Sequence, residues 1–291
     1  MQLFVNDLTV MDFSYLCPER GMVGESWIVD VILHGSLNEE SMVLDFGKVK
    51  KELKYLIDEY VDHKLVIPAE HAYTESKTDP LNDNVVVSFN RPGHEIYLSC
   101  PAESFAFVYA DEVTMTSVSG YLRDVLAIHL PDNVNNIELI LRTEQIPTPF
   151  YHYTHGLKKH DGNCQRIAHG HRSKITVMRN GENAAQQEAY WAQRWRDIYI
   201  GTSSDVIPFS QLSEMIQATA NSNEKVCFSY EASQGKFELV MPETACELID
   251  TDSTVECLAQ YIADEQKSMM PDDEIQIFAY EGVGKGAIAY A

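Results

Sequence analysis

Short stretches in which apolar and polar residues alternate recur along the chain, and this pattern is typical of half-buried strands. In the first half the pattern covers residues 26–34, 85–89, 95–99 and 137–142. In the second half it covers residues 172–180, 226–230, 236–241 and 274–280. The last strand of each half follows a Pro-Asp pair, at Pro131-Asp132 and at Pro271-Asp272.

A second pattern, in which apolar residues recur every three or four positions, predicts an amphipathic helix between Gly47 and Tyr60. The apolar positions of this helix are Val49, Leu53, Leu56, Ile57 and Tyr60. Asp45 is placed to cap its first turn. Further helices are predicted to start near residues 101–103 and 253–256, and Ser253 with Glu256 fits a capping box, which needs no functional role.

The order of these elements repeats once along the chain. Val23-Gly24-Glu25 corresponds to His169-Gly170-His171, and Gly35 corresponds to Gly181, both at an offset of 146 residues. Hairpin-paired strands with helices on one face describe an antiparallel α+β domain. The sequence therefore predicts an α+β fold with two tandem domains, residues 1–146 and 147–291.

Composition narrows the class of protein. The chain of 291 residues is 45% hydrophobic, so it can build packed cores, and its formal net charge of −22 disfavours nucleic-acid binding. No apolar run is long enough to span a membrane, and the first residues lack the pattern of a secretory signal. Six cysteines without a CxxC pair favour a reducing compartment, and we expect a cytoplasmic protein. Neither GxGxxG nor GxxxxGK[ST] occurs.

Histidines crowd one segment and predict a metal site. His169 and His171 are two residues apart, so on a strand they point to the same side. His155 becomes a third ligand if its strand pairs with the His169 strand, and His152 and His160 compete for this place. Three imidazoles with an open position are typical of catalytic zinc. A chance HxH on a surface strand and a closed structural zinc with Cys164 are the alternatives.

Two further features carry candidate chemistry. Cys164 lies in a predicted turn among basic residues, which favours a partly exposed thiolate, although an isolated cysteine is often inert. Asp62-His63 follows the first helix and is a candidate acid/base pair, while the alternative is a histidine at a helix end. The basic residues of this region fit either a polyphosphate substrate or a solvated loop; they are Lys158, Lys159, Arg166, Arg172 and Lys174.

These motifs, in this order, resemble the 6-pyruvoyltetrahydropterin synthase / 6-carboxytetrahydropterin synthase family. The second half carries the aromatic-x-x-x-His, Cys and His-Gly-His landmarks as Tyr151 to His155, Cys164, and His169 to His171. The first half carries the Asp-Phe stretch and the Asp-His pair as Asp45-Phe46 and Asp62-His63. The helix-start and late glutamate landmarks occur in both halves, as Glu103, Glu256, Glu144 and Glu281.

The resemblance implies a T-fold: an antiparallel four-stranded sheet with two helices on one face, here in two tandem copies. The first copy has Val23-Gly24-Glu25 where the family has His-Gly-His, and in the second Ile200 to Asp205 stands where the Asp-His pair is expected. Neither copy is complete, but together they hold one full set. The resemblance therefore implies one composite site between unlike halves, and two chains closing a barrel of four domains.

By the same resemblance, the chain is a zinc-dependent lyase of tetrahydropterin or queuosine biosynthesis that acts on 7,8-dihydroneopterin triphosphate. The product is 6-pyruvoyl- or 6-carboxytetrahydropterin, and the sequence does not decide between them. Zn²⁺ is held by His155, His169 and His171. The catalytic residues are Cys164, Asp62 and His63, and the substrate-binding residues come from Glu281, Glu144, Glu103 and Glu256. The alternatives are a T-fold enzyme acting on another pterin or purine, and a non-catalytic pterin- or zinc-binding module.

Overall fold

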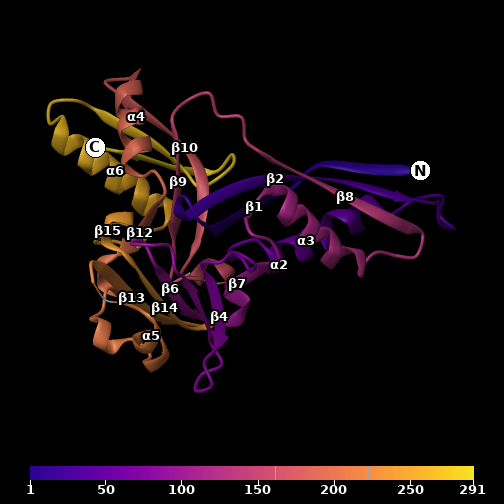
Figure 1. The fold of residues 1–291 in the computed structure, drawn as a ribbon. Helices are drawn as coiled ribbons and strands as arrows, with labels where there is room; N and C mark the ends of the chain where they lie inside the picture. The colour runs from indigo at the N-terminus through magenta and orange to yellow at the C-terminus, as the bar shows by residue number, and fades with distance from the viewer. Residues whose placement is uncertain (161, 222) are drawn as a thin grey trace.

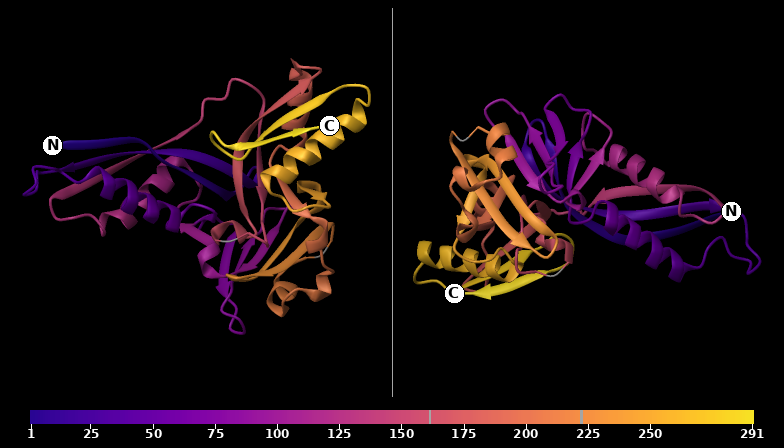
Figure 2. Two further views of the ribbon diagram at one scale, coloured as in Figure 1. Left: turned by 180° about the vertical axis from the view of Figure 1, so that it is seen from behind. Right: turned by 90° about the horizontal axis from the view of Figure 1, so that it is seen from below.

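The computed structural model describes residues 1–160, 162–221 and 223–291, and Figure 1 shows three sheets flanked by helices. One sheet belongs to the first half of the chain, one to the second half, and a third takes strands from both. The first-half sheet and its helices extend away from the rest of the molecule, with the N-terminus at the far end (Figures 1 and 2).

The first-half sheet has the strand order β7-β3-β1-β2-β8. Its centre is a long antiparallel hairpin of β1 and β2, and β8 pairs antiparallel with β2. The short strands β3 and β7 are added in parallel on the other side of β1. The strands span Gln2–Cys17 (β1), Gly21–Gly35 (β2), Leu65–Pro68 (β3), Phe105–Val108 (β7) and Val134–Thr143 (β8).

Two helices cover one face of this sheet. A continuous helix runs through α1 (Phe46–Lys48), a π-helical turn (Val49–Leu53) and α2 (Lys54–Tyr60), and Asp45 caps it by accepting a hydrogen bond from the Lys48 N–H. The second helix is α3 (Met115–Ala127). Apolar residues of both helices pack with β1, β2 and β8 in one buried cluster, as expected for amphipathic helices on a sheet.

The prediction of a helix at residues 101–103 is wrong. Ala102–Ser104 is a single 3₁₀ turn, because the next residues continue as β7 beside β3. The helix begins only at Met115, where Thr114 and Ser117 form a capping box. In the second half the predicted box of Ser253 and Glu256 is wrong, since Thr254 rather than Ser253 caps the helix by accepting from the Cys257 N–H.

The second-half sheet repeats this arrangement, with the order β15-β12-β9-β10-β16-β17. Here the central hairpin is β9 and β10, β12 and β15 are the parallel additions, and α4 and α6 pack on one face. The fold class, α+β with two tandem copies, is therefore confirmed, although each sheet exceeds four strands. The elements span Phe150–His155 (β9), His169–Arg179 (β10), Glu182–Asn183 (β11, which pairs with β10), Ala185–Arg194 (α4), Ile198–Thr202 (β12), Cys246–Ile249 (β15), Val255–Met269 (α6), Ile275–Tyr280 (β16) and Gly286–Tyr290 (β17). The predicted domain boundary after residue 146 lies between β8 and β9.

The third sheet joins the two halves in the order β13-β14-β6-β5-β4. The joint is the antiparallel pair of β14 with β6, in which Leu239 lies opposite Leu98. The short helix α5 (Glu214–Thr219) packs against β5 and β6 through Ile216. The strands span Thr74–Thr78 (β4), Val85–Phe89 (β5), Ile96–Cys100 (β6), Lys225–Ala232 (β13) and Gly235–Pro242 (β14).

The two central hairpins also touch directly, at a point where only glycines fit. A Cβ atom built on Gly24 of β2 would lie 1.9 Å from the Tyr153 carbonyl oxygen, and one built on Gly170 of β10 would lie 2.7 Å from the Gly24 Cα atom. Beside them the Ser14 and Thr154 hydroxyls are 2.7 Å apart. Gly24 lies opposite Ser14 in its hairpin, and Gly170 lies opposite Thr154 in the other. Equivalent positions of the two copies therefore meet here.

Candidate functional site

Three histidines of the second half converge beside this contact. His169 lies directly opposite His155 in the β9–β10 hairpin, and His171 is two residues further along β10. One nitrogen from each ring lies within 4.8 Å of the others, and the Nε2 atoms of His155 and His171 are 3.3 Å apart. All three side chains are buried. The hairpin thus brings together the three residues that the sequence predicted as metal ligands.

Each of these rings has an oxygen atom within 3.2 Å of Nδ1. His155 donates to the Ser253 carbonyl at 2.9 Å, and His169 donates to the Arg166 carbonyl at 3.1 Å. His171 Nδ1 lies 3.2 Å from Asp12 Oδ1. Oxygen partners at Nδ1 fix the ring orientation and leave Nε2 as the metal-binding atom. The donor set therefore fits a zinc ion held by three imidazoles.

The environment also keeps the ligands in the form that binds a metal. Burial lowers the pKa of His155 and His169 well below the ordinary histidine range, so these rings are neutral. His152 and His160, the competing candidates, are not part of this triad. His152 instead donates from Nδ1 to the Gly24 carbonyl at 2.7 Å.

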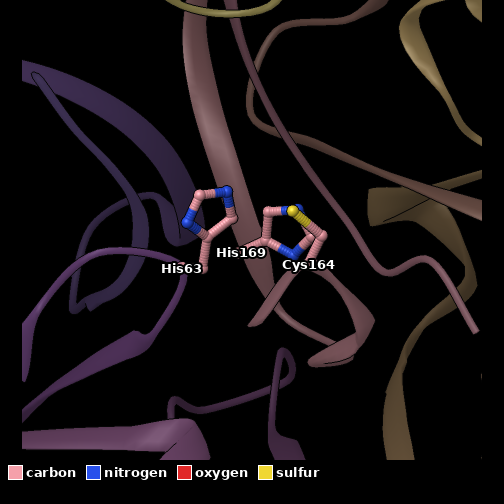
Figure 3. A group of neighbouring side chains, drawn as sticks. All are labelled: His63, Cys164 and His169. Carbon is pink, nitrogen blue, oxygen red and sulfur yellow. The ribbon is translucent and has the colours of Figure 1, made fainter. Parts of the chain in front are cut away.

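Cys164 lies next to the triad, together with a histidine from the first half of the chain. The three ligand atoms of His63, Cys164 and His169 lie within 4.8 Å of one another. Figure 3 shows that His63 comes from the first-half ribbon, whereas Cys164 and His169 come from the second. Cys164 is partly exposed and belongs to the 3₁₀ turn Gly162–Gln165, which agrees with the predicted turn.

The Asp62-His63 pair is held in an unusual local conformation. His63 has a φ of 55°, in the left-handed region, and its Nδ1 donates to Asp62 Oδ2 at 2.6 Å. Two more hydrogen bonds tie the segment to β1, from the His63 N–H to the Asp12 carbonyl and from the Asp12 N–H to Asp62 Oδ1, each at 2.7 Å. These contacts bring the side chains of two adjacent residues together, which is the geometry that the predicted acid/base pair requires.

His63 is protonated at neutral pH. Burial alone would lower its pKa, but the hydrogen bond with Asp62 and the interaction with Cys164 outweigh it and raise the pKa to about 10. This imidazolium lies next to Cys164, so the two side chains are placed to exchange a proton.

The candidate glutamates occupy different places. Glu281 follows β16, and its Oε1 lies 3.8 Å from His171 Nε2. Glu144 follows β8 and forms an ion pair with Lys174 at 2.9 Å. Glu103 and Glu256 are both exposed, in the 3₁₀ turn before β7 and in the first turn of α6. Of the four, Glu281 is the one that contacts a ligand histidine.

The structure adds residues that sequence reasoning missed. Asp12 accepts a hydrogen bond from the Ser26 hydroxyl at 2.5 Å, and its Oδ2 lies 3.2 Å from Lys285 Nζ. Burial would raise the pKa of Asp12, but His171 and Lys285 outweigh it and lower the pKa. An isolated aspartate on a strand gave no sequence signal, and only the crossing of the hairpins brings it to His171.

The basic residues of the second half do not form one patch. Lys158 pairs with Asp205, Lys159 with Asp252 and Lys174 with Glu144, which fits the solvated-surface interpretation for these three. Arg172 donates to the Glu144 carbonyl at 2.9 Å and lies over the Phe150 ring. Arg166 is different, because it is 3% exposed and lies two residues after Cys164 in the sequence.

A second place in the structure is equivalent to the composite site, with the parts of the two halves exchanged, and it carries different residues. Strand register matches His63 with Asp197, since Leu65 pairs with Ser14 as Tyr199 pairs with Thr154. The expectation that residues 200–205 replace the Asp-His pair is therefore corrected. Asp197 forms an ion pair with Arg20, with Nε to Oδ2 at 3.0 Å.

The remaining positions of this second place lack the histidine triad. Tyr15, Val23 and Glu25 stand where the other copy has His155, His169 and His171. Arg20 Nη1 lies 3.4 Å from the Tyr15 hydroxyl, and the Glu25 carboxyl is 3.8 Å from His152. This place is built from an ion pair and a buried carboxyl.

Comparisons with known proteins point to one family. Residues 17–142 match the family model described as 6-pyruvoyl tetrahydropterin synthase, a range that includes Asp62 and His63 and ends before the histidine triad. The chain is 33% identical over 105 residues to a putative 6-carboxy-5,6,7,8-tetrahydropterin synthase of Methanocaldococcus jannaschii. That match covers 33% of this chain and 64% of the relative's own length.

Solved structures with partial similarity carry the same name. The 6-pyruvoyl tetrahydropterin synthase of Plasmodium vivax is 16% identical with a TM-score of 0.40, covering 51% of this chain and 93% of its own. That of Plasmodium falciparum is 13% identical with a TM-score of 0.39, covering 48% and 90%.

The family match confirms the resemblance found in the motifs, and it concerns residues 17–142 of this α+β chain. No helix within the described part of the chain is both long and apolar enough to cross a bilayer.

Proposed function

We propose that the protein is a zinc-dependent pterin synthase, a lyase that converts 7,8-dihydroneopterin triphosphate to 6-pyruvoyl- or 6-carboxytetrahydropterin. The observation that carries this proposal is the composite site. His63 of the first half, hydrogen-bonded to Asp62, lies against Cys164 and His169 of the second half, so the two incomplete copies together supply the expected set. We propose residues 1–146 and 147–291 as the two domains.

Each residue has a defined part in the proposed reaction. His155, His169 and His171 would hold zinc, which when bound supplies Lewis acidity to substrate hydroxyl oxygens. Cys164 is the base that takes a proton from the substrate side chain. His63 stabilises the thiolate and carries the proton for the opposite step, and Asp62 fixes its ring.

Glu281 is the proposed anchor of the pterin ring. A carboxylate matches the two N–H groups of a guanidine-like edge. Glu281 lies beside the histidine triad and is about one quarter exposed, so its carboxylate can bind the N–H groups of the ring. Glu144 is less suitable, because it already forms an ion pair with Lys174. Glu103 and Glu256 are proposed as secondary substrate contacts only.

Two chains are proposed to close a four-domain barrel. Strands β8 and β17 are the outer strands of their sheets, so each chain has edges on which a second copy can pair. Light scattering should then give a mass of twice 32.9 kDa or a multiple of that, and a monomer or a trimer would contradict the barrel.

The test is incubation with dihydroneopterin triphosphate and mass analysis of the products, with and without a chelator. The wild type should turn over substrate only when zinc is bound. Cys164→Ala should lose turnover and keep its zinc, whereas the matched control Cys257→Ala, at another partly exposed cysteine, should keep both. Loss of zinc from Cys164→Ala would identify the thiol as a ligand and favour the non-catalytic zinc module. A zinc-dependent product from another pterin or a purine would favour the other enzyme class.

A further inference from the structure

Two buried cations flank the composite site. Lys64 directly follows His63, and Arg166 is two residues after Cys164. They are 7% and 3% exposed, respectively. One comes from the first half of the chain and the other from the second, so the pair exists only where the two copies meet.

Neither cation is neutralised by a close partner. In the described ranges, 1–160, 162–221 and 223–291, no side-chain hydrogen bond or ion pair within 4.0 Å is formed by Lys64 or Arg166, and Arg166 Nε and Nη1 are buried without a partner. Lys158, Lys159 and Lys174 nearby all have carboxylate partners. Burying a guanidinium without a partner costs free energy. A site that binds an anion can carry this cost, because the bound anion supplies the missing partner.

The positive charges of Lys64 and Arg166 repel each other. Burial lowers the pKa of Lys64 to about 8, and Arg166 contributes to this lowering. Glu59 and Glu103 attract both cations, but both glutamates are exposed and screened by water. The Arg166 carbonyl accepts a hydrogen bond from His169 Nδ1 at 3.1 Å, and Lys64 directly follows His63, so both cations border the composite site.

We propose that Lys64 and Arg166 form an anion subsite that binds a phosphoryl group of the substrate beside Cys164. This proposal rests on the proposed function, because it supplies the place for the substrate's phosphates. The guanidinium of arginine can donate two parallel hydrogen bonds to phosphate oxygens, and lysine adds a compact positive charge. An oxyanion here satisfies the orphaned guanidinium and removes the repulsion between the two cations.

Binding of inorganic triphosphate tests the subsite without any pterin chemistry. Isothermal titration of the zinc-loaded full chain, with zinc measured before and after, should show binding to the wild type. Lys64→Met and Arg166→Met should each weaken it at least tenfold. Arg123→Met is the control, because Arg123 is an exposed cation on α3, and its affinity should stay within twofold.

Thermal melting of the ligand-free protein separates a binding role from a structural one. Removing an unpaired buried charge does not break an ion pair, so Arg166→Met should melt at or above the wild-type temperature. A lower melting temperature together with unchanged triphosphate affinity would overturn the proposal. If Arg166→Met does not fold, Arg166→Lys, which keeps one charge but loses the fork, should show intermediate affinity, and wild-type affinity in both Arg166→Lys and Lys64→Met would overturn it.

The two proposals fail in different ways. Triphosphate binding that is lost in the variants, together with no pterin turnover by the wild type, would keep the subsite and refute the lyase. Turnover by the wild type with an unchanged KM in Lys64→Met and Arg166→Met would keep the lyase and refute the subsite.

Discussion

The contact between the two central hairpins makes a sharp prediction for Gly24→Ala. The new Cβ atom would lie 1.9 Å from the Tyr153 carbonyl oxygen and 2.7 Å from the backbone nitrogen of His171. Both neighbours are backbone atoms in a paired strand, so no side-chain rotation can relieve the clash. The hairpins must separate instead, and His171 must move away from Asp12.

The size of the effect follows from these distances. An ordinary Cβ contact is 3.4 Å or more, so the hairpins must separate by roughly 1.5 Å at this point. Overpacking of a rigid core costs about 1–3 kcal/mol, and the backbone clash places Gly24→Ala at the upper end, about 3 kcal/mol. For a chain of this size, this corresponds to a fall in melting temperature of about 6–12 °C.

The assay is thermal unfolding followed by circular dichroism, with zinc content measured on the same samples. Gly120→Ala is the control, because Gly120 lies in α3 and a Cβ atom there meets nothing within 4 Å. It should raise the free energy of unfolding by up to about 1 kcal/mol through helix propensity. Gly24→Ala should melt well below the wild type and bind less zinc. Melting within 2 °C of the wild type would refute the close packing of the two copies.

Three further predictions concern charge and metal. Burial raises the pKa of Glu25 to about 7, above its unfolded value, so ionisation of Glu25 destabilises the fold as the pH rises through about 4.5–7. Urea unfolding should therefore show that Glu25→Gln is more stable than the wild type at pH 8, by up to about 3 kcal/mol, and equally stable at pH 4. The pKa of His63 is raised to about 10, so the stability that His63 contributes is full below about pH 6.5 and is lost as the pH rises to about 10. The difference in free energy of unfolding between the wild type and His63→Asn should shrink over that range. A constant difference would contradict the raised pKa. His155→Ala should lose zinc measured by atomic absorption, whereas His160→Ala should retain it, and equal zinc in both would rule out the triad as the metal site.

Sequence alone could predict that the three histidines converge, because their geometry is local. His169 and His171 are two residues apart on one strand, so they lie on the same side of it. The register of a single hairpin places His155 opposite His169. The proximity of Asp62 and His63 to Cys164 could not be derived this way, because about 100 residues separate them and only the family resemblance suggested it. Their position depends on how two separate sheets pack.

The errors have local physical causes. Residues 101–103 have a helix-like start, but the apolar stretch Phe105–Val108 is taken up as an edge strand beside β3. The true start, Thr114 with Ser117, uses a serine where a glutamate or glutamine is the usual signal. Asp12 carried no pattern at all, since it meets His171 and Lys285 only through the folding of distant segments.

The pairing of β14 with β6 has a consequence for the history of this gene. A duplicated gene can be split again only if each product folds by itself. Here a separated first half would expose the edge of β6, including Leu98, and a separated second half would expose the edge of β14. Bare apolar strand edges promote aggregation, so separation would be penalised even if both products were made together. The shared sheet therefore makes the fusion hard to reverse.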